Sequence, residues 1–270
     1  MQFVKLEFVG AVASLTLQQA GGNRINFRMR EEILGAINSV ASSKARVLVI
    51  KGDGENFCLG GDVREWPGLS VNSLRPKVEV FAHALDRLAQ LDIPTVASVQ
   101  GVCAGGGFEL ALACDLIIAS RSARFSFPEA SIGIMTLQGG VYNLAQRIGR
   151  TKALELAFLS EPISSERLAE WNVVNRVVDA DDLDQEVGTL ADRLAAGPAM
   201  VYAATKDLLR VWEREGVAGS RKALYDLSMP LFETEDTQRA LRNVAAAVTE
   251  GKPIPRATFE ATPSRPSGSV

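Results

Sequence analysis

Histidine and cysteine are scarce in this sequence, which contains only His83 and the three cysteines Cys58, Cys103 and Cys114. A single histidine makes a histidine-based metal site nearly impossible and leaves Ser-His-Asp or Cys-His catalysis dependent on one residue. We interpret His83 as a surface or packed core residue, and we expect no metal site. Three cysteines do not make a disulfide framework and are typical of a reducing compartment, so we expect a cytoplasmic location. Catalytic chemistry therefore depends mostly on carboxylates and the backbone.

Excess positive charge is also absent, because 29 Lys and Arg residues face 32 Asp and Glu residues and give a net charge of −3. Binding through neutralised phosphates needs a basic surface, so this balance argues against a nucleic-acid partner. The N-terminal residues lack the basic and apolar segments of a secretory signal. The most apolar stretch, 93–120, is interrupted by Gln100, Glu109 and Asp115 and is a poor membrane span. We therefore expect neither a nucleic-acid nor a membrane partner.

What the sequence does contain is typical of a globular protein, with 270 residues of which 47% are hydrophobic and 23% charged. Alternating apolar residues over 3–17 predict two short strands that turn at Gly10. Further apolar runs predict strands at 47–50, 95–99, 116–119 and 125–127. Apolar residues at helical spacing predict helices at 28–42, 75–91, 108–114, 140–148 and 151–159. Strands that alternate with helices predict an α/β fold with parallel strands.

The C-terminal part of the chain has a different pattern, in which helical spacing continues and strand patterns disappear. Helices are predicted at 183–195, 200–212, 221–232 and 237–249. We therefore place a boundary near residue 190, between an α/β core at 1–190 and a helical region at 191–260. The last residues, 261–270, are rich in Pro, Ser and Gly and are predicted to be disordered.

Two glycine-containing turns, 56–62 and 101–109, each follow an apolar strand. Ligands of open α/β sheets bind at the carboxyl ends of strands, which is where both turns lie. Together they are able to offer two backbone N–H donors to one oxygen, which is what an oxyanion hole needs. On the pattern alone, turns that merely join a strand to a helix remain the alternative. Neither turn matches a Walker loop or a Gly-x-Gly-x-x-Gly dinucleotide motif.

Two carboxylates lie in unusually apolar surroundings and form a candidate acid/base pair. Glu109 follows the second glycine turn, and Glu129 follows Phe125 to Pro128. The alternative is that each only caps or favours the start of a helix. Asp62 is better explained as a cap than as a catalyst. Trp66 is equally consistent with lining a pocket or filling the core.

Three of these segments together resemble the crotonase superfamily, which is the enoyl-CoA hydratase/isomerase family. The segment 93–115 (IPTVASVQGVCAGGGFELALACD) resembles the family's hallmark sequence. The segment 57–62 (FCLGGD) resembles its other oxyanion turn, and 125–129 (FSFPE) resembles its second catalytic segment. The resemblance extends from about residue 3 to residue 259 with the motifs in matching order.

The resemblance implies a spiral of ββα units and a helical C-terminal region that builds trimers, usually paired into hexamers. It also implies an acyl-CoA ligand whose thioester oxygen is held by the backbone N–H groups of Gly61 and Gly106. In hydratases of the family, the residue matching Glu109 activates water for attack on the β-carbon, and the residue matching Glu129 protonates the α-carbon. Coenzyme A is then part of the substrate, and no separate cofactor is expected.

The presence of both glutamates favours an enoyl-CoA hydratase, which adds water to a trans-2-enoyl-CoA in syn fashion and gives a 3-hydroxyacyl-CoA. The alternatives are another crotonase-type enzyme, such as an isomerase or a lyase, and a non-catalytic CoA-binding or RNA-binding protein. One departure from typical hydratases is Thr136-Leu137 in place of Pro-Gly, which bears on substrate size and on the reaction. By position, the expected substrate-binding residues are Leu59, Gly60, Asp62, Trp66, Gly105 and Leu137.

Overall fold

The computed structural model describes residues 2–255 and 257–259, so the tail predicted to be disordered, 261–270, lies outside the described residues. The chain divides into two compact units, one ending at Asp192 and the other beginning at Arg193. Each unit is described separately below. Within the described residues, no helix is long and apolar enough to cross a membrane.

The first unit is built around a six-stranded sheet with the strand order β1-β2-β3-β4-β6-β9. Its first two strands, β1 (Val4–Val9) and β2 (Val12–Leu17), form the hairpin predicted to turn at Gly10. All the other neighbours in this sheet are parallel, as the α/β pattern predicts. These strands are β3 (Val47–Gly52), β4 (Thr95–Val99), β6 (Leu116–Ser120) and β9 (Arg176–Val178).

A second, three-stranded sheet consists of β5 (Val102–Ala104), β7 (Arg124–Ser126) and β8 (Ile163–Ser164). From β4 to β7, consecutive strands alternate between the sheets, because the chain passes from β4 to β5 and later from β6 to β7. An isolated parallel bridge between Cys58 and Cys103 places the segment after β3 beside β5, next to the three-stranded sheet. Each turn of chain therefore contributes one strand to each sheet before a helix returns it, and the predicted crotonase-like spiral is confirmed.

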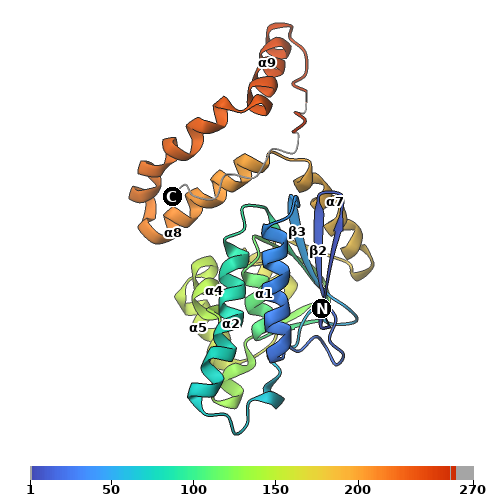
Figure 1. Cartoon of the computed structure of the whole chain (residues 1–270), viewed down its shortest axis with the longest axis vertical. Helices are drawn as coiled ribbons and strands as arrows, with labels where there is room; N and C mark the ends of the chain where they lie inside the picture. The colour runs from blue at the N-terminus through green and yellow to red at the C-terminus, as the bar shows by residue number, and fades with distance from the viewer. Residues whose placement is uncertain (1, 256, 260–270) are drawn as a thin grey trace. The chain divides into compact units, whose positions relative to one another are not determined.

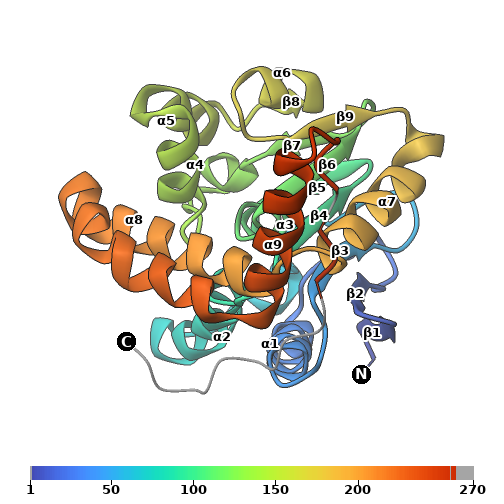
Figure 2. The same ribbon diagram turned by 90° about the horizontal axis from the view of Figure 1, so that it is seen from above.

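Helices complete the first unit, and α1 (Phe27–Ala41) and α2 (Val71–Ala89) lie side by side in both ribbon views (Figures 1 and 2). The predicted start of α2 at residue 75 was four residues late, because the Ser70 hydroxyl accepts a hydrogen bond from the Ser73 N–H and caps an earlier start. The other helices of this unit are α3 (Gly106–Leu112), α4 (Gly140–Ile148), α5 (Arg150–Leu159), α6 (Ser165–Glu170) and α7 (Leu183–Ala195), the last crossing the unit boundary.

Aromatic side chains fill the core beneath α3. The Phe108 ring stacks on Phe127 with centroids 4.8 Å apart and lies tilted against Phe125 at 5.2 Å. The three cysteines are buried and form no disulfide, as packing residues are expected to be. His83 lies on the exposed side of α2, in agreement with a surface residue.

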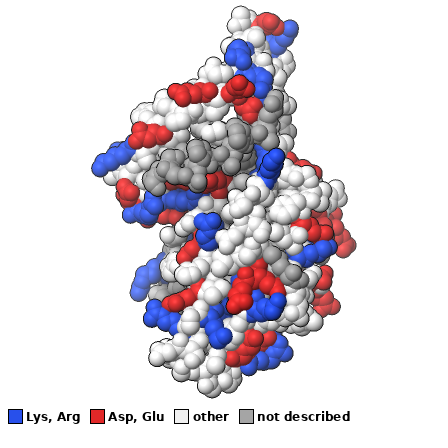
Figure 3. All heavy atoms as spheres, in the orientation of Figure 1, with Lys and Arg blue, Asp and Glu red and all other residues white. Residues whose placement is uncertain are grey.

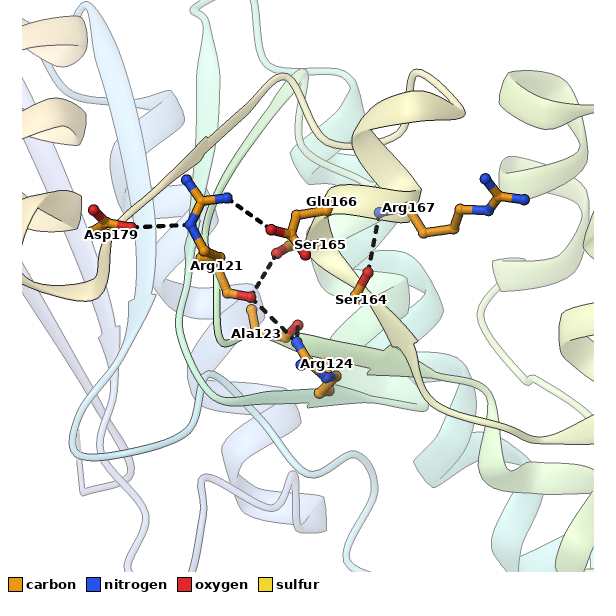
Figure 4. A network of polar contacts seen from close by, with 8 residues as sticks. All are labelled: Arg121, Ala123, Arg124, Ser164, Ser165, Glu166, Arg167 and Asp179. Carbon is orange, nitrogen blue, oxygen red and sulfur yellow. Dashed lines mark hydrogen bonds and ion pairs between the residues drawn. The ribbon is translucent and has the colours of Figure 1, made fainter.

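The surface carries charges of both signs, which are interspersed over the face shown in Figure 3. One polar network joins the turn after β6 to α6 and to the end of β9 (Figure 4). Its centre is Arg121, whose guanidinium lies 2.7 Å from a Glu166 oxygen and 3.1 Å from an Asp179 oxygen. Solvent screens exposed ion pairs of this kind, so the network orients these segments more than it stabilises them.

The second unit is helical. Its main helix, α8 (Ala199–Ser228), joins two predicted helices across a bend at Gly216, whose φ of 66° and ψ of −164° are not helical. A short 3₁₀ helix (Met229–Glu233) and α9 (Glu235–Thr249) follow. Several large apolar side chains of this unit are exposed within the single chain, including Trp212, Tyr225 and Phe232. An apolar surface of this kind is typical of a protein–protein contact.

Candidate active site

A small cavity in the first unit brings together six of the residues singled out in the sequence, namely Gly61, Trp66, Gly106, Glu109, Glu129 and Leu137. They come from the turn after β3, from α3, and from the segment after β7. The cavity has a volume of about 30 Å³, which is room for about two water molecules.

The two glycine turns are held against each other by backbone hydrogen bonds. The Cys58 N–H donates to the Val102 carbonyl at 3.1 Å, and the Ala104 N–H donates to the Cys58 carbonyl at 2.9 Å. Glycine is required at Gly60, where φ is +91° and a Cβ would lie 2.9 Å from the Ala104 carbonyl oxygen. The close approach of the two turns therefore depends on the absence of a side chain.

The backbone N–H groups of Gly61 and Gly106 are available to a ligand. The neighbouring Asp62 N–H donates to the Ile25 carbonyl, and the Gly105 N–H donates to the Ser126 carbonyl. By contrast, the Gly61 and Gly106 N–H groups donate no hydrogen bond within the described chain, and the Gly61 nitrogen lies 3.8 Å from the position of a Cβ on Gly106. Two free donors at neighbouring positions are what an oxyanion hole requires.

Glu109 lies in the first turn of α3 and is only 1% exposed. One of its carboxylate oxygens, Oε1, accepts hydrogen bonds from the Gln138 N–H at 2.8 Å and the Gly140 N–H at 2.9 Å. Burial raises the pKa of Glu109 to about 7, and the nearby Glu129 charge adds to this effect, while the two N–H donors oppose it. A carboxylate that titrates near neutral pH is suited to general base catalysis.

Glu129 lies in a short 3₁₀ helix (Pro128–Ile132) that follows β7. Its Oε2 atom is buried and has no hydrogen-bond partner among the described residues. Its Oε1 atom lies 2.6 Å from the place that a Cβ on Gly105 would occupy, so the carboxylate fills the space left by that glycine. Burial raises the pKa of Glu129 above its ordinary value, which favours the protonated form that a general acid needs.

Two free N–H donors and two carboxylates of raised pKa thus face one cavity at the carboxyl ends of the strands. The family model for enoyl-CoA hydratase/isomerase matches residues 7–245. The chain belongs to the enoyl-CoA hydratase/isomerase family. This is the crotonase superfamily that the motifs resemble, and the spiral fold agrees with it.

The chain is similar to members of this family that catalyse different reactions. It is 34% identical to mevalonyl-coenzyme A hydratase of Aspergillus fumigatus over 67% of each chain. It is 33% identical to 1,2-epoxyphenylacetyl-CoA isomerase of Escherichia coli, over 73% of this chain and 78% of the relative. A crystal structure of an enoyl-CoA hydratase subunit from Geobacillus kaustophilus covers 96% of this chain and 98% of its own, with a TM-score of 0.83 and 32% identity.

Four of the residues expected to bind substrate, Leu59, Gly60, Asp62 and Gly105, do not line the cavity of this crotonase-type site. Gly60 and Gly105 instead allow the two turns and Glu129 to approach. Leu59 lies over Gly22, where a Cβ would meet its side chain. Asp62 caps a short 3₁₀ helix (Val63–Glu65) and pairs with Arg64 at 2.6 Å, in agreement with its interpretation as a cap.

The sequence analysis missed five residues that line the crotonase-type cavity, and two of them are polar, Arg30 and Gln138. Arg30 precedes Ile33 by three positions and Ile37 by seven, so it lies on the apolar stripe of α1. A charged residue within an apolar stripe is unusual, and this pattern could have identified Arg30 as a candidate site residue. Gln138 lies in a loop, where no sequence pattern could have identified it. The other three residues are Ile25, Phe81 and Ile134.

Proposed function

We propose that the protein hydrates a trans-2-enoyl-CoA, by syn addition of water, to the 3-hydroxyacyl-CoA. The observation that carries this proposal is the placement of Glu109 and Glu129 at one cavity, beside the free N–H groups of Gly61 and Gly106. Hydration needs a base for water, an acid for the α-carbon and a site for negative charge on the thioester oxygen. The cavity offers one candidate for each of these roles.

In the proposed reaction, the ionised Glu109 takes a proton from water while the water oxygen forms a bond to the β-carbon. The electron pair of the double bond moves to the thioester, and the enolate oxygen accepts hydrogen bonds from the N–H groups of Gly61 and Gly106. The protonated Glu129 then gives its proton to the α-carbon. Glu109 ends protonated and Glu129 ends ionised, and proton exchange between them or with solvent restores the starting state.

The hydrogen bonds that the two glutamates accept differ in a way that supports these roles. The hydrogen bonds from the Gln138 and Gly140 N–H groups stabilise the ionised form of Glu109 although it is buried. Oε2 of Glu129 receives no such bond, and burial favours its neutral form. The free donors at Gly61 and Gly106 are fixed before the reaction, so no reorganisation is needed when charge develops on the oxygen.

Double-bond isomerisation is the second candidate, because it also passes through a thioester enolate and needs only one carboxylate to move a proton. The bulky Leu137 beside the cavity favours it, since this side chain competes with water for space near Glu129. The similarity to an isomerase at 33% identity is consistent with the same possibility. A hydratase and an isomerase differ in product mass, because hydration adds one water to the acyl group whereas isomerisation leaves its mass unchanged.

The test is a screen of trans-2-enoyl-CoA substrates of graded length and branching, followed by loss of the enoyl-thioester absorbance. The Glu109→Gln and Glu129→Gln variants are each expected to lower kcat by about a hundredfold or more, the usual scale for loss of general acid–base catalysis. Glu161→Gln, at an exposed position, is the matched control and is expected to retain wild-type activity. Full hydratase activity in Glu109→Gln would contradict the role of Glu109 in activating water.

A further inference from the structure

The cavity contains more hydrogen-bond donors than hydration requires. Three buried donor atoms of lining residues have no partner among the described residues: Nε of Arg30, Nε1 of Trp66 and Nε2 of Gln138. Buried polar groups without partners destabilise a folded protein, so an ordered water or a ligand usually satisfies them. The excess of donors indicates a ligand that brings acceptor oxygens.

Of the three donors, the one on Arg30 is the most costly to bury without a partner, because the side chain carries a charge. It is 2% exposed, and among the described residues its side chain makes one hydrogen bond, from Nη1 to the Lys77 carbonyl at 3.1 Å. It makes no ion pair with any described residue, and the nearby charges that favour its ionised form are the carboxylates of Glu65 and Glu109. Burial lowers the pKa of Arg30 to about 10, so the side chain remains charged at neutral pH.

Aromatic rings hold the guanidinium in place. The central carbon lies 5.2 Å from the Phe27 ring centre and 5.7 Å from the Trp66 ring centre. Stacking of this kind keeps the planar donor group in one orientation, which favours two-pronged recognition of a carboxylate. The indole N–H of Trp66 is a further unpartnered donor of the same cavity.

The position of Arg30 relates it to the acyl part of a ligand. A Cβ on Gly61 would lie 3.6 Å from Nη2 of Arg30 and 3.0 Å from the Trp66 ring, so both side chains border the turn that holds the thioester oxygen. The same cavity contains Glu109 and Glu129, which face the reacting carbons in the proposed function. A group that reaches Arg30 from this point is part of the acyl chain.

We propose that Arg30, together with the indole N–H of Trp66, binds a carboxylate on the acyl chain, so that the preferred substrate is the CoA thioester of an unsaturated dicarboxylic acid. This inference rests on the proposed function for the location of the thioester in the cavity. It differs from a direct role of Arg30 at the thioester oxygen, which would act on charged and uncharged acyl groups alike.

Equilibrium binding of two unreactive thioesters tests the inference without any turnover. Glutaryl-CoA carries a terminal carboxylate, and butyryl-CoA is the uncharged comparison. We expect the wild-type protein to bind glutaryl-CoA about ten- to a hundredfold more tightly, the range for hydrogen bonds to charged groups. Arg30→Met is expected to abolish the preference and Arg30→Lys to restore part of it. Arg28→Met, on the exposed side of the same helix, is the control and retains the preference.

A second measurement compares turnover of the matched enoyl pair, glutaconyl-CoA and crotonyl-CoA. The expected result is that Arg30→Met lowers kcat/KM for glutaconyl-CoA alone. Equal wild-type affinity for the two saturated thioesters would overturn the inference even if Arg30→Met failed to fold. An equal loss for both enoyl substrates in Arg30→Met would also overturn it, in favour of a role at the thioester oxygen.

The outcomes separate this inference from the proposed function. A carboxylate preference without hydration of any enoyl-CoA would refute the hydratase proposal and retain the inference. Hydration without a carboxylate preference would do the reverse. If the protein bound no acyl-CoA at all, both proposals would be wrong.

Discussion

Replacement of Gly105 by alanine tests whether the placement of Glu129 controls the reaction. A Cβ on Gly105 would lie 2.6 Å from Oε1 of Glu129, whereas ordinary contacts begin at 3.4 Å. The carboxylate must therefore move by about 0.8 Å, because the other nearby atoms lie at ordinary contact distances. A displacement of about 1 Å at a reacting group lowers rates about a hundredfold, so we expect a loss of that order in kcat.

The substitution also strains the backbone, because φ of Gly105 is +51° and ψ is −124°, a region almost restricted to glycine. Such strain destabilises a protein by about 1–3 kcal/mol. Gly10→Ala is the matched control, since Gly10 has a φ of +58° with no atom within 4 Å of an added Cβ. We expect Gly10→Ala to lower the unfolding temperature but to retain wild-type kcat.

The assay is kcat for the best enoyl-CoA of the screen, measured on variants shown to be folded by circular dichroism. In a Glu129→Gln background, Gly105→Ala is expected to cause little further loss, because both changes act on the same group. A folded Gly105→Ala variant with kcat within threefold of wild type would refute the argument that the Glu129 carboxylate must lie where Gly105 allows it.

Two further predictions concern pH and assembly. Since Glu109 must be ionised and its pKa is about 7, kcat/KM is expected to rise with pH through about 7. A profile that is flat from pH 5.5 to 8 would contradict this role. Exposed apolar side chains of the second unit, such as Trp212 and Phe232, predict a trimer or hexamer, and a monomeric mass by light scattering at micromolar concentration would contradict it.

Much of the first unit could be predicted because its signals are local. The strands at 95–99 and 116–119 are short apolar runs, and the structure places β4 and β6 there. The helix after the second glycine turn was predicted two residues late, since Gly106 and Gly107 are poor helix formers. Here the turn geometry fixed by the Gly105 backbone overrides residue preference.

The rest of the site depends on contacts between segments that are distant in the sequence. Glu109 receives hydrogen bonds from a loop 29 and 31 residues further along, and no periodic pattern announces such a contact. Arg30 reaches the cavity because α1 packs against α2, where Lys77 accepts its hydrogen bond. The two helices predicted at 200–212 and 221–232 both lie within α8, and the break between them falls at Gly216, whose backbone angles are not helical.

The backbone bridge between Cys58 and Cys103 holds the N–H donors of the site, whereas a different part of the chain sets the ionisation of Glu109. This bridge holds together the two turns that carry the Gly61 and Gly106 N–H groups, and these turns belong to successive ββα units of the spiral. The ionisation of Glu109 is instead governed by a surface loop that supplies the Gln138 and Gly140 N–H groups. Under the proposed function, exchange of that loop would consequently change proton transfer by Glu109 while leaving the two N–H donors in place.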